Sequence, residues 1–201
     1  RSVDAHTHVF KELGCQILDD KKGLHIKCKK LKGKQIILPE LSVTATENAL
    51  MAAVLAEGKT EIHLAAAEPH VQDLCLFLNK MGAKISGIST NNLKIQGVKS
   101  LKGCSYKITG DYLEAGTFAI AAVATESEII INGINPNHLD SFWQKLEEMG
   151  AKFTLSKDSV HIHPVKNLKA VKILRTAVYP SFPTDLQAPF SILLTKANGV
   201  S

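Results

Sequence analysis

The sequence has few aromatic residues, no long apolar run and no signal-peptide pattern at its first residues. Phe, Trp and Tyr make up 5% of the 201 residues, which is few for a surface that stacks the bases of single-stranded nucleic acid. No run of about 18 apolar residues is present, so we expect no membrane-spanning helix and no membrane partner. A cytoplasmic location is the expectation that follows.

The cysteines also lack a pattern. Cys15, Cys28, Cys75 and Cys104 show neither Cys-x-x-Cys spacing nor clustering with histidine, and such spacing is the usual sign of a structural zinc site. In a mid-sized intracellular chain, isolated cysteines are mostly reduced and packed. We therefore expect no metal site.

Positive charge is concentrated in the first third of the chain. The formal net charge is +5, and eight lysines fall within 24 residues: Lys11, Lys21, Lys22, Lys27, Lys29, Lys30, Lys32 and Lys34. Such a face can simply be solvated, or it can attract an anionic small molecule such as a nucleotide diphosphate. Nucleic acid is the weaker interpretation because aromatic residues are scarce. The apolar content of 45% suits a globular chain of one or two domains.

One pattern recurs along the chain. Gly14, Gly82 and Gly150 are each 68 residues apart, and each follows Leu or Met. Apolar residues with helical spacing precede the second and third of these glycines: Val71, Leu74, Cys75, Leu78 and Met81, then Leu139, Phe142, Trp143, Leu146 and Met149. Alternating residues after each glycine predict a hairpin, at 16–26, 83–97 and 152–162. One structural unit is therefore used repeatedly.

The rest of each unit is predicted from similar signals. A short strand is expected at 36–38, 106–108 and 171–173, an Ala-rich helix at 47–56, at 114–124 and from Gln187, and a further strand at 60–64 and 128–131. Thr44 and Glu47 have the spacing of a capping box for the first of these helices. Together the segments predict a mixed α/β (α+β) fold with about three repeats of about 68 residues.

A loop near the end of the chain has an unusual composition. Pro180 and Pro183 exclude helix and strand between them, yet polar residues stand on either side of this segment. Thr184 or Asp185 can cap the helix that follows. Alternatively, the loop can hold the Asp185 carboxylate near the free N–H groups of that helix and present it to a ligand.

The segment 175–188 reads Arg-Thr-Ala-x-x-Pro-x-Phe-Pro-Thr-Asp-x-Gln-Ala, and it resembles a loop of the UDP-N-acetylglucosamine enolpyruvyl transferase family. In that family the aspartate of this loop contacts the sugar hydroxyl that attacks phosphoenolpyruvate. The resemblance implies that Asp185 is the general base and that Thr184 contacts substrate.

Two further segments resemble the same family. Residues 1–6 resemble Arg-Pro-Val-Asp-x-His, with Ser2 in place of proline, and residues 40–44 resemble Lys-Val-Ser-Val-Gly, with Glu40 and Thr44 as departures. The resemblance implies that both segments bind the nucleotide and phosphate groups through Arg1, Ser2, Val3, Asp4, Ala5, His6, Glu40, Leu41, Ser42 and Val43. The residues themselves leave a plainer interpretation open: Ser42 could be a helix cap, and His6 falls at a core position of the repeat, with Val3, Thr7, Phe10 and Leu13.

The resemblance implies an inside-out α/β architecture of βαβαββ units. Residues 1–109 would be the later part of one lobe and residues 110–201 the start of a second, although three units could also close into one pseudo-threefold domain. The implied reaction transfers enolpyruvate from phosphoenolpyruvate to UDP-N-acetylglucosamine, without organic cofactor or metal. Segments of the full-length enzyme, including its cysteine loop, have no counterpart here, so the chain alone is expected to be inactive.

Two alternatives stay open at this point. A shikimate-pathway enolpyruvyl transferase would share the fold and the chemistry, although the loop at 175–188 favours the sugar-nucleotide enzyme. A non-catalytic repeat module that binds nucleic acid or another acidic partner through the lysine-rich face is the alternative from a different class. The departures at Glu40 and Thr44 favour that second reading.

Overall fold

The computed structural model describes residues 2–20 and 23–201. The chain divides into two compact units, Arg1–Ile108 (unit 1) and Thr109–Ser201 (unit 2), and each has its own hydrophobic core. Across the described ranges, every helix is too short or too polar to cross a bilayer. The assignment of the two units to the lobes of a larger enzyme stays a prediction.

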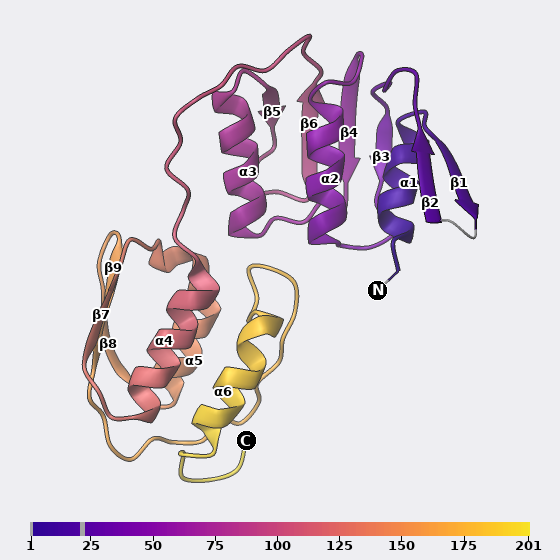
Figure 1. Cartoon of the computed structure of the whole chain (residues 1–201). Coiled ribbons are helices and arrows are strands. Elements are labelled where there is room, and N and C mark those ends of the chain that lie inside the picture. Colours follow the sequence, from indigo (N-terminus) through magenta and orange to yellow (C-terminus); the bar gives the residue numbers. More distant parts are fainter. Residues whose placement is uncertain (1, 21–22) are drawn as a thin grey trace. The chain divides into compact units, whose positions relative to one another are not determined.

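Unit 1 consists of three helices over a four-stranded sheet. The helices α1 (Asp4–Glu12), α2 (Val43–Ala53) and α3 (Pro69–Lys80) lie side by side in front of the strands (Figure 1). The sheet has the order β3 (Gln35–Ile37), β4 (Lys59–His63), β6 (Asn92–Gln96) and β5 (Lys84–Ser86). Only the β3–β4 pair is parallel. A separate antiparallel hairpin, β1 (Gln16–Asp20) and β2 (Gly23–Lys27), follows α1.

Alternation along the strands forms the core of unit 1. Side chains of successive strand residues point to opposite faces, and on β6 the residues Leu93 and Ile95 are buried while Asn92 and Lys94 are exposed. Asn79 at the end of α3 fixes the next strand: its side chain accepts a hydrogen bond from Ile85 N (2.8 Å) and donates one to Ile85 O (2.9 Å). The hairpin β5–β6 is thereby attached to the helix that precedes it.

Unit 2 packs three helices and two 3₁₀ turns against a three-stranded sheet. In chain order its elements are α4 (Tyr112–Ala124), β7 (Ile129–Asn132), η1 (Pro136–Leu139), α5 (Asp140–Glu148), β8 (Lys152–Leu155), β9 (Ser159–His163), η2 (Thr184–Leu186) and α6 (Gln187–Leu194). The strand order is β7-β9-β8, with both pairs antiparallel. Phe142 lies at the centre of the core, in edge-to-face contact with Trp143 and Phe190.

The same local structure recurs at the spacing seen in the sequence. Lys32, Lys102 and Lys169 each donate a backbone hydrogen bond to the residue before the recurring glycine, and the acceptors are Leu13 O (3.0 Å), Met81 O (2.8 Å) and Met149 O (2.9 Å). Gly14, Gly82 and Gly150 all have positive φ, between 86° and 100°, which is the conformation that ends many helices. The predicted helix–hairpin repeat is confirmed at this local level, while the number of complete units stays a prediction.

Two of the expected joining strands are wrong. Residues 35–37 form β3 because they pair with β4, whereas 106–108 and 171–173 join no sheet in the part of the chain that the structure describes. Tyr106 uses its side chain instead: the hydroxyl donates to Asp73 Oδ1 (2.8 Å) and the ring packs edge-on against Phe77. Val171 is fully buried in the core of unit 2.

Candidate functional site

The loop before α6 is held by two buried side chains. Phe182 is 3% exposed, and its ring centroid lies 6.0 Å from that of Phe142 and 5.2 Å from that of Phe190. Leu186 is fully buried. The backbone of the loop closes through a hydrogen bond from Ala177 N to Phe182 O (3.2 Å). Thr184 and Asp185 lie between these two anchors, and both are exposed.

A glycine in α4 sets the distance between that helix and the loop. A Cβ atom at Gly116 would lie 2.6 Å from Leu186 Cδ1, closer than carbon atoms can approach. The packing of Leu186 on α4 therefore depends on the missing side chain. At the start of the same helix, Asp111 caps α4 by accepting hydrogen bonds from Leu113 N and Glu114 N.

Asp185 and Thr184 do not cap a helix. The 3₁₀ turn η2 has Pro183 at its cap position and α6 has Leu186, and neither end shows a side-chain cap hydrogen bond. The cap interpretation is wrong because a turn comes between the loop and α6, so Asp185 lies inside that turn. The Asp185 side chain is exposed, which leaves its carboxylate available to a ligand.

The start of α2 carries the second candidate segment. Ser42 is the N-cap residue: its hydroxyl accepts from Ala45 N (3.4 Å) and its carbonyl accepts from Thr46 N (3.0 Å). The expected capping box of Thr44 and Glu47 is wrong because the helix begins at Val43, one residue before Thr44. A hydrogen bond from Ser42 N to Glu40 O (2.9 Å) forms a tight turn that leaves Glu40 and Leu41 exposed.

His6 connects α1 to the first turns of α2. The Asn48 amide nitrogen lies 2.7 Å from His6 Nδ1, and Thr44 Oγ1 lies 3.3 Å from His6 Nε2. With Asn48 donating to Nδ1, a neutral ring carries its hydrogen on Nε2 and donates it to Thr44. The Thr44 hydroxyl can then donate a hydrogen bond to an anionic group. Asn48 was not predicted from the sequence, although Thr44 and Asn48 are four residues apart and so share one side of α2.

The predicted inward face of α1 is wrong in part. Ala5, Val9 and Leu13 are buried, whereas Val3 is 50% exposed and His6 only half-buried, as are Thr7 and Phe10. The buried positions of α1 therefore differ from the equivalent positions in α3 and α5, and His6 contacts polar groups of α2 instead. Ser2 and Asp4 bond to each other at the helix start (2.6 Å). Arg1, for which a phosphate contact was predicted, lies outside the described residues.

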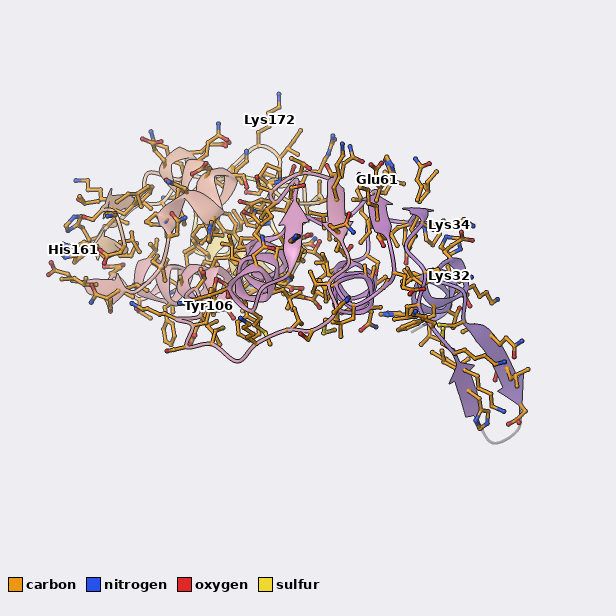
Figure 2. The ribbon with its side chains drawn as sticks, turned by 90° about the horizontal axis from the view of Figure 1, so that it is seen from above. Lys32, Lys34, Glu61, Tyr106, His161 and Lys172 are labelled. Carbon is orange, nitrogen blue, oxygen red and sulfur yellow. The ribbon has the colours of Figure 1, made fainter. Side chains whose placement is uncertain are left out.

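The lysine-rich face forms a shallow hollow in unit 1. A volume of about 580 Å³ is lined by Gly14, Gln16, Lys27, Cys28, Lys29, Lys30 and Lys32. Part of the charge on this face is already neutralised, since Lys30 pairs with Glu57 and Lys34 pairs with Glu12 (2.6 Å). The hydrogen bond from Lys34 holds the pKa of Glu12 below its ordinary value. Lys32 and Lys34 lie at the periphery of the unit in Figure 2.

The whole chain matches one family of known proteins. The family model described as EPSP synthase (3-phosphoshikimate 1-carboxyvinyltransferase) matches residues 1–201. The chain belongs to the enolpyruvyl transferase family. The predicted membership of the enolpyruvyl transferases is thereby confirmed.

Curated relatives in this family share nearly half of the residues. "UDP-N-acetylglucosamine 1-carboxyvinyltransferase 2" of Bacillus subtilis is 46% identical over 202 residues, which cover 100% of this chain and 47% of that protein. "UDP-N-acetylglucosamine 1-carboxyvinyltransferase" of Prochlorococcus marinus (strain MIT 9312) is 47% identical over 205 residues, covering 100% and 44%. The chain thus spans about half the length of these relatives.

Solved structures of enolpyruvyl transferases show the same fold. NikO from Streptomyces tendae superposes with a TM-score of 0.87 at 22% identity, over 99% of this chain and 50% of that one. EPSP synthase from Acinetobacter baumannii gives a TM-score of 0.66 at 23% identity, over 97% and 45%. The architecture described above is therefore that of part of an enolpyruvyl transferase.

Proposed function

We propose that this chain supplies part of the active site of a UDP-N-acetylglucosamine enolpyruvyl transferase, an enzyme of peptidoglycan synthesis in the cytoplasm. The observation that carries the proposal is the exposed carboxylate of Asp185. It lies on a turn that the buried side chains of Phe182 and Leu186 anchor, and it does not cap a helix. The identity to the curated sugar-nucleotide relatives supports this substrate over shikimate 3-phosphate.

The reaction needs a base and a means of releasing phosphate. The 3′-hydroxyl oxygen of UDP-N-acetylglucosamine bonds to C2 of phosphoenolpyruvate while its proton passes to a base and C3 gains a proton. C3 then loses a proton, the bond from C2 to the phosphate oxygen breaks, and inorganic phosphate leaves. Asp185 takes the hydroxyl proton in the first step, which requires the carboxylate to lie within hydrogen-bond reach of that hydroxyl. Thr184 contacts the substrate beside it.

The start of α2 suits the nucleotide diphosphate. N–H groups at a helix N-terminus and the positive end of the helix dipole favour a phosphate group there. Ser42, Val43 and the Thr44 hydroxyl, which His6 orients, lie at this end of the helix, and the segment Arg1–Ala5 and Glu40–Leu41 complete the proposed contacts. The negative charge of Glu40 opposes a diphosphate, so we expect modest affinity.

The 201 residues alone are expected to be inactive. None of the four cysteines lies in a Gly-Gly-Cys loop of the kind that bears the reactive cysteine in this family. Enolpyruvyl transfer would therefore require the remaining segments. Phosphate release from phosphoenolpyruvate by the isolated chain with UDP-N-acetylglucosamine would contradict this expectation.

Calorimetric titration of the chain with UDP-N-acetylglucosamine tests the binding half of the proposal. We expect saturable binding that Asp185→Asn weakens, because a contact to the sugar hydroxyl is lost, and that Asp158→Asn leaves unchanged. Asp158 is a matched control because it is an exposed aspartate of the same unit, in the turn between β8 and β9. Absent binding of the sugar nucleotide, with salt-sensitive binding of a short oligonucleotide instead, would favour the acidic-partner alternative.

A chimera tests the catalytic half. The 201 residues can replace the matching 47% of the Bacillus subtilis relative, and the product can be assayed for phosphate release. Loss of a general base lowers the rate by about 10²–10⁴-fold, so Asp185→Asn should lower kcat by that factor while Asp158→Asn has no effect. Equal rates for the two variants in a folded, active chimera would exclude Asp185 as the base.

A further inference from the structure

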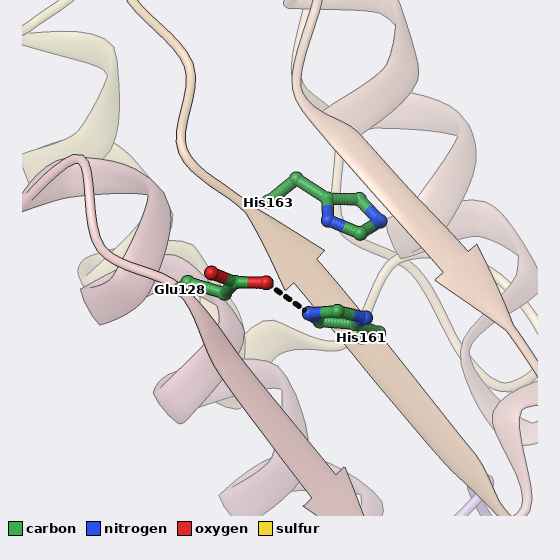
Figure 3. A group of neighbouring side chains, drawn as sticks. All are labelled: Glu128, His161 and His163. Carbon is green, nitrogen blue, oxygen red and sulfur yellow. Dashed lines mark hydrogen bonds and ion pairs between the residues drawn. The ribbon is translucent and has the colours of Figure 1, made fainter.

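Three potential metal ligands converge on the solvent side of the sheet in unit 2. His161 and His163 are two residues apart on β9 and therefore point to the same face. Glu128 directly precedes β7, whose Ile129 pairs with Ile162, so its position continues the register opposite His163. One ligand atom from each of the three side chains lies within 4.8 Å of the others (Figure 3).

The contacts among these groups are already close. His161 Nε2 lies 2.7 Å from Glu128 Oε1, and the centroids of the two histidine rings are 4.1 Å apart. Thr154 Oγ1 on the neighbouring strand lies 3.2 Å from His163 Nε2. The side chain of His161 is 33% exposed and that of Glu128 is 59% exposed, and Figure 2 shows His161 at the outer surface of the unit. An ion can therefore reach the group from solvent.

We propose that Glu128, His161 and His163 bind a divalent transition-metal cation of the zinc class. Two imidazole nitrogens and one carboxylate oxygen form a ligand set that Zn²⁺ accepts, with bond lengths of about 2.0–2.2 Å. Ligands at that distance around a tetrahedral ion are separated by about 3.4 Å. His161 Nε2 and Glu128 Oε1 are 2.7 Å apart, and the ligand atoms of all three residues lie within 4.8 Å of one another, so small side-chain rotations are enough.

The hydrogen bonds of the two histidines determine which ring nitrogen of each would bind the ion. The cation takes the place of the hydrogen between His161 Nε2 and Glu128, and the ring carries that hydrogen on Nδ1 instead. Thr154 occupies His163 Nε2, which leaves Nδ1 to bind the ion. A hydrogen bond to the second ring nitrogen is the usual way in which a metal-binding imidazole is held in orientation. The fourth coordination position faces solvent and takes water.

Binding would join two strands of the sheet. Glu128 leads into β7 while both histidines belong to β9, so one ion would cross-link the ends of two neighbouring strands and stabilise unit 2. Lys152 pairs with His163 in the β8–β9 register, and its positive charge acts against the cation. The expectation of no metal came from the cysteine pattern and from the family resemblance, and neither considers these three residues. This site depends on strand register and is independent of the proposed enolpyruvyl transfer.

Zinc titration of the chain tests the proposal. Cys28 and Cys104 are exposed thiols that could compete for zinc, so both are first replaced by serine. In this background we expect one Zn²⁺ per chain by calorimetry and a melting temperature that rises with zinc concentration, since the ion binds only the folded site. Thr154→Val should weaken zinc binding by about 10-fold through loss of orientation, and Lys152→Gln should strengthen it.

Two double variants, each lacking two histidines, decide whether zinc binds at this site. The first, His161→Gln with His163→Gln, should lose the stoichiometric site while keeping its metal-free melting temperature. The second, His25→Gln with His63→Gln, removes two histidines from unit 1 and should bind zinc as before. Absence of stoichiometric binding in the background chain, or equal loss in both double variants, would overturn the proposal.

Discussion

Ser42 and Asp185 both stand next to the start of a helical segment, and their side chains are used differently. The Ser42 hydroxyl accepts a hydrogen bond from within α2, so the helix itself needs this residue. The Asp185 carboxylate makes no cap hydrogen bond, and the turn around it is held by the apolar anchors Phe182 and Leu186. A polar group that the fold does not use is the better candidate for catalysis, whereas Ser42 has a structural role that is independent of its proposed ligand contact.

Removal of the anchor Phe182 should have the largest effect on stability. Phe182→Ala deletes a ring that is 3% exposed in the core of unit 2 and should lower the free energy of unfolding by about 3–5 kcal/mol. Asp185→Asn, three residues away, should change it by less than about 0.5 kcal/mol. Trp143 is the single tryptophan and is buried in unit 2, so its fluorescence during urea unfolding measures this unit alone.

Substitution of Gly116 should have the next largest effect on stability. Gly116→Ala places a methyl group 2.6 Å from Leu186 Cδ1, and overpacking of this kind costs about 1–3 kcal/mol. Because Leu186 adjoins Asp185, the same substitution should also weaken binding of UDP-N-acetylglucosamine. A pairing of Gly116→Ala with Leu186→Ala, which makes room for the methyl group, should cost less than the sum of the two single variants. Additive costs would mean that this contact does not position the loop.

Substitution of Ser42 should have a smaller effect, confined to unit 1. Ser42→Ala removes an N-cap and should cost about 0.5–1 kcal/mol, since the hydrogen bond is long at 3.4 Å. Ser42→Asp keeps a capping oxygen and should preserve stability, but its charge should weaken nucleotide binding. Circular dichroism should detect the loss in Ser42→Ala, while the Trp143 transition stays at the same urea concentration. A shift of that transition would show that α2 also supports unit 2.

The smallest effects concern two glutamates that pair with lysines, the half-buried Glu12 and the exposed Glu148. Lysine hydrogen bonds lower the pKa of Glu12, through Lys34, and of Glu148, through Lys145. A lowered pKa means that each pair stabilises the fold above the unfolded value of about 4.3 and that this contribution is lost as the pH falls through the folded pKa. Glu12→Gln and Glu148→Gln should each remove about 0.2–1 kcal/mol at pH 7 and flatten the acid limb of stability, where the pH falls from the unfolded pKa through the lowered folded pKa.

Local patterns in the sequence predicted most of the helices and hairpins correctly. Helical spacing at 71–81 corresponds to α3, and alternation at 152–162 corresponds to β8 and β9. Errors arose where tertiary contacts decide. No strand forms at 106–108, where the Tyr106 side chain bonds to Asp73. His6, expected at a core position, is half-buried and bonds to Asn48, a residue 42 positions away.

In the candidate site, too, local motifs were recognised in the sequence and tertiary contacts were not. The motif at 175–188 predicted substrate roles for Asp185 and Thr184, and these stay predictions. The alternative cap role is excluded by the intervening 3₁₀ turn. Asn48 was missed because its partner lies on another helix. Glu128, His161 and His163 were missed for a similar reason, since only the pairing of Ile129 with Ile162 brings the glutamate to the histidines.

The recurring helix–hairpin structure also bears on how fast the chain can fold. In each copy a backbone hydrogen bond closes a short loop, from Lys32 to Leu13, from Lys102 to Met81 and from Lys169 to Met149. Contacts between residues about 20 positions apart form early, because little chain entropy is lost in closing so small a loop. The three segments can therefore acquire structure independently, before the longer loops that complete each sheet have closed. A nascent chain would have ordered helix–hairpin pieces as it is made.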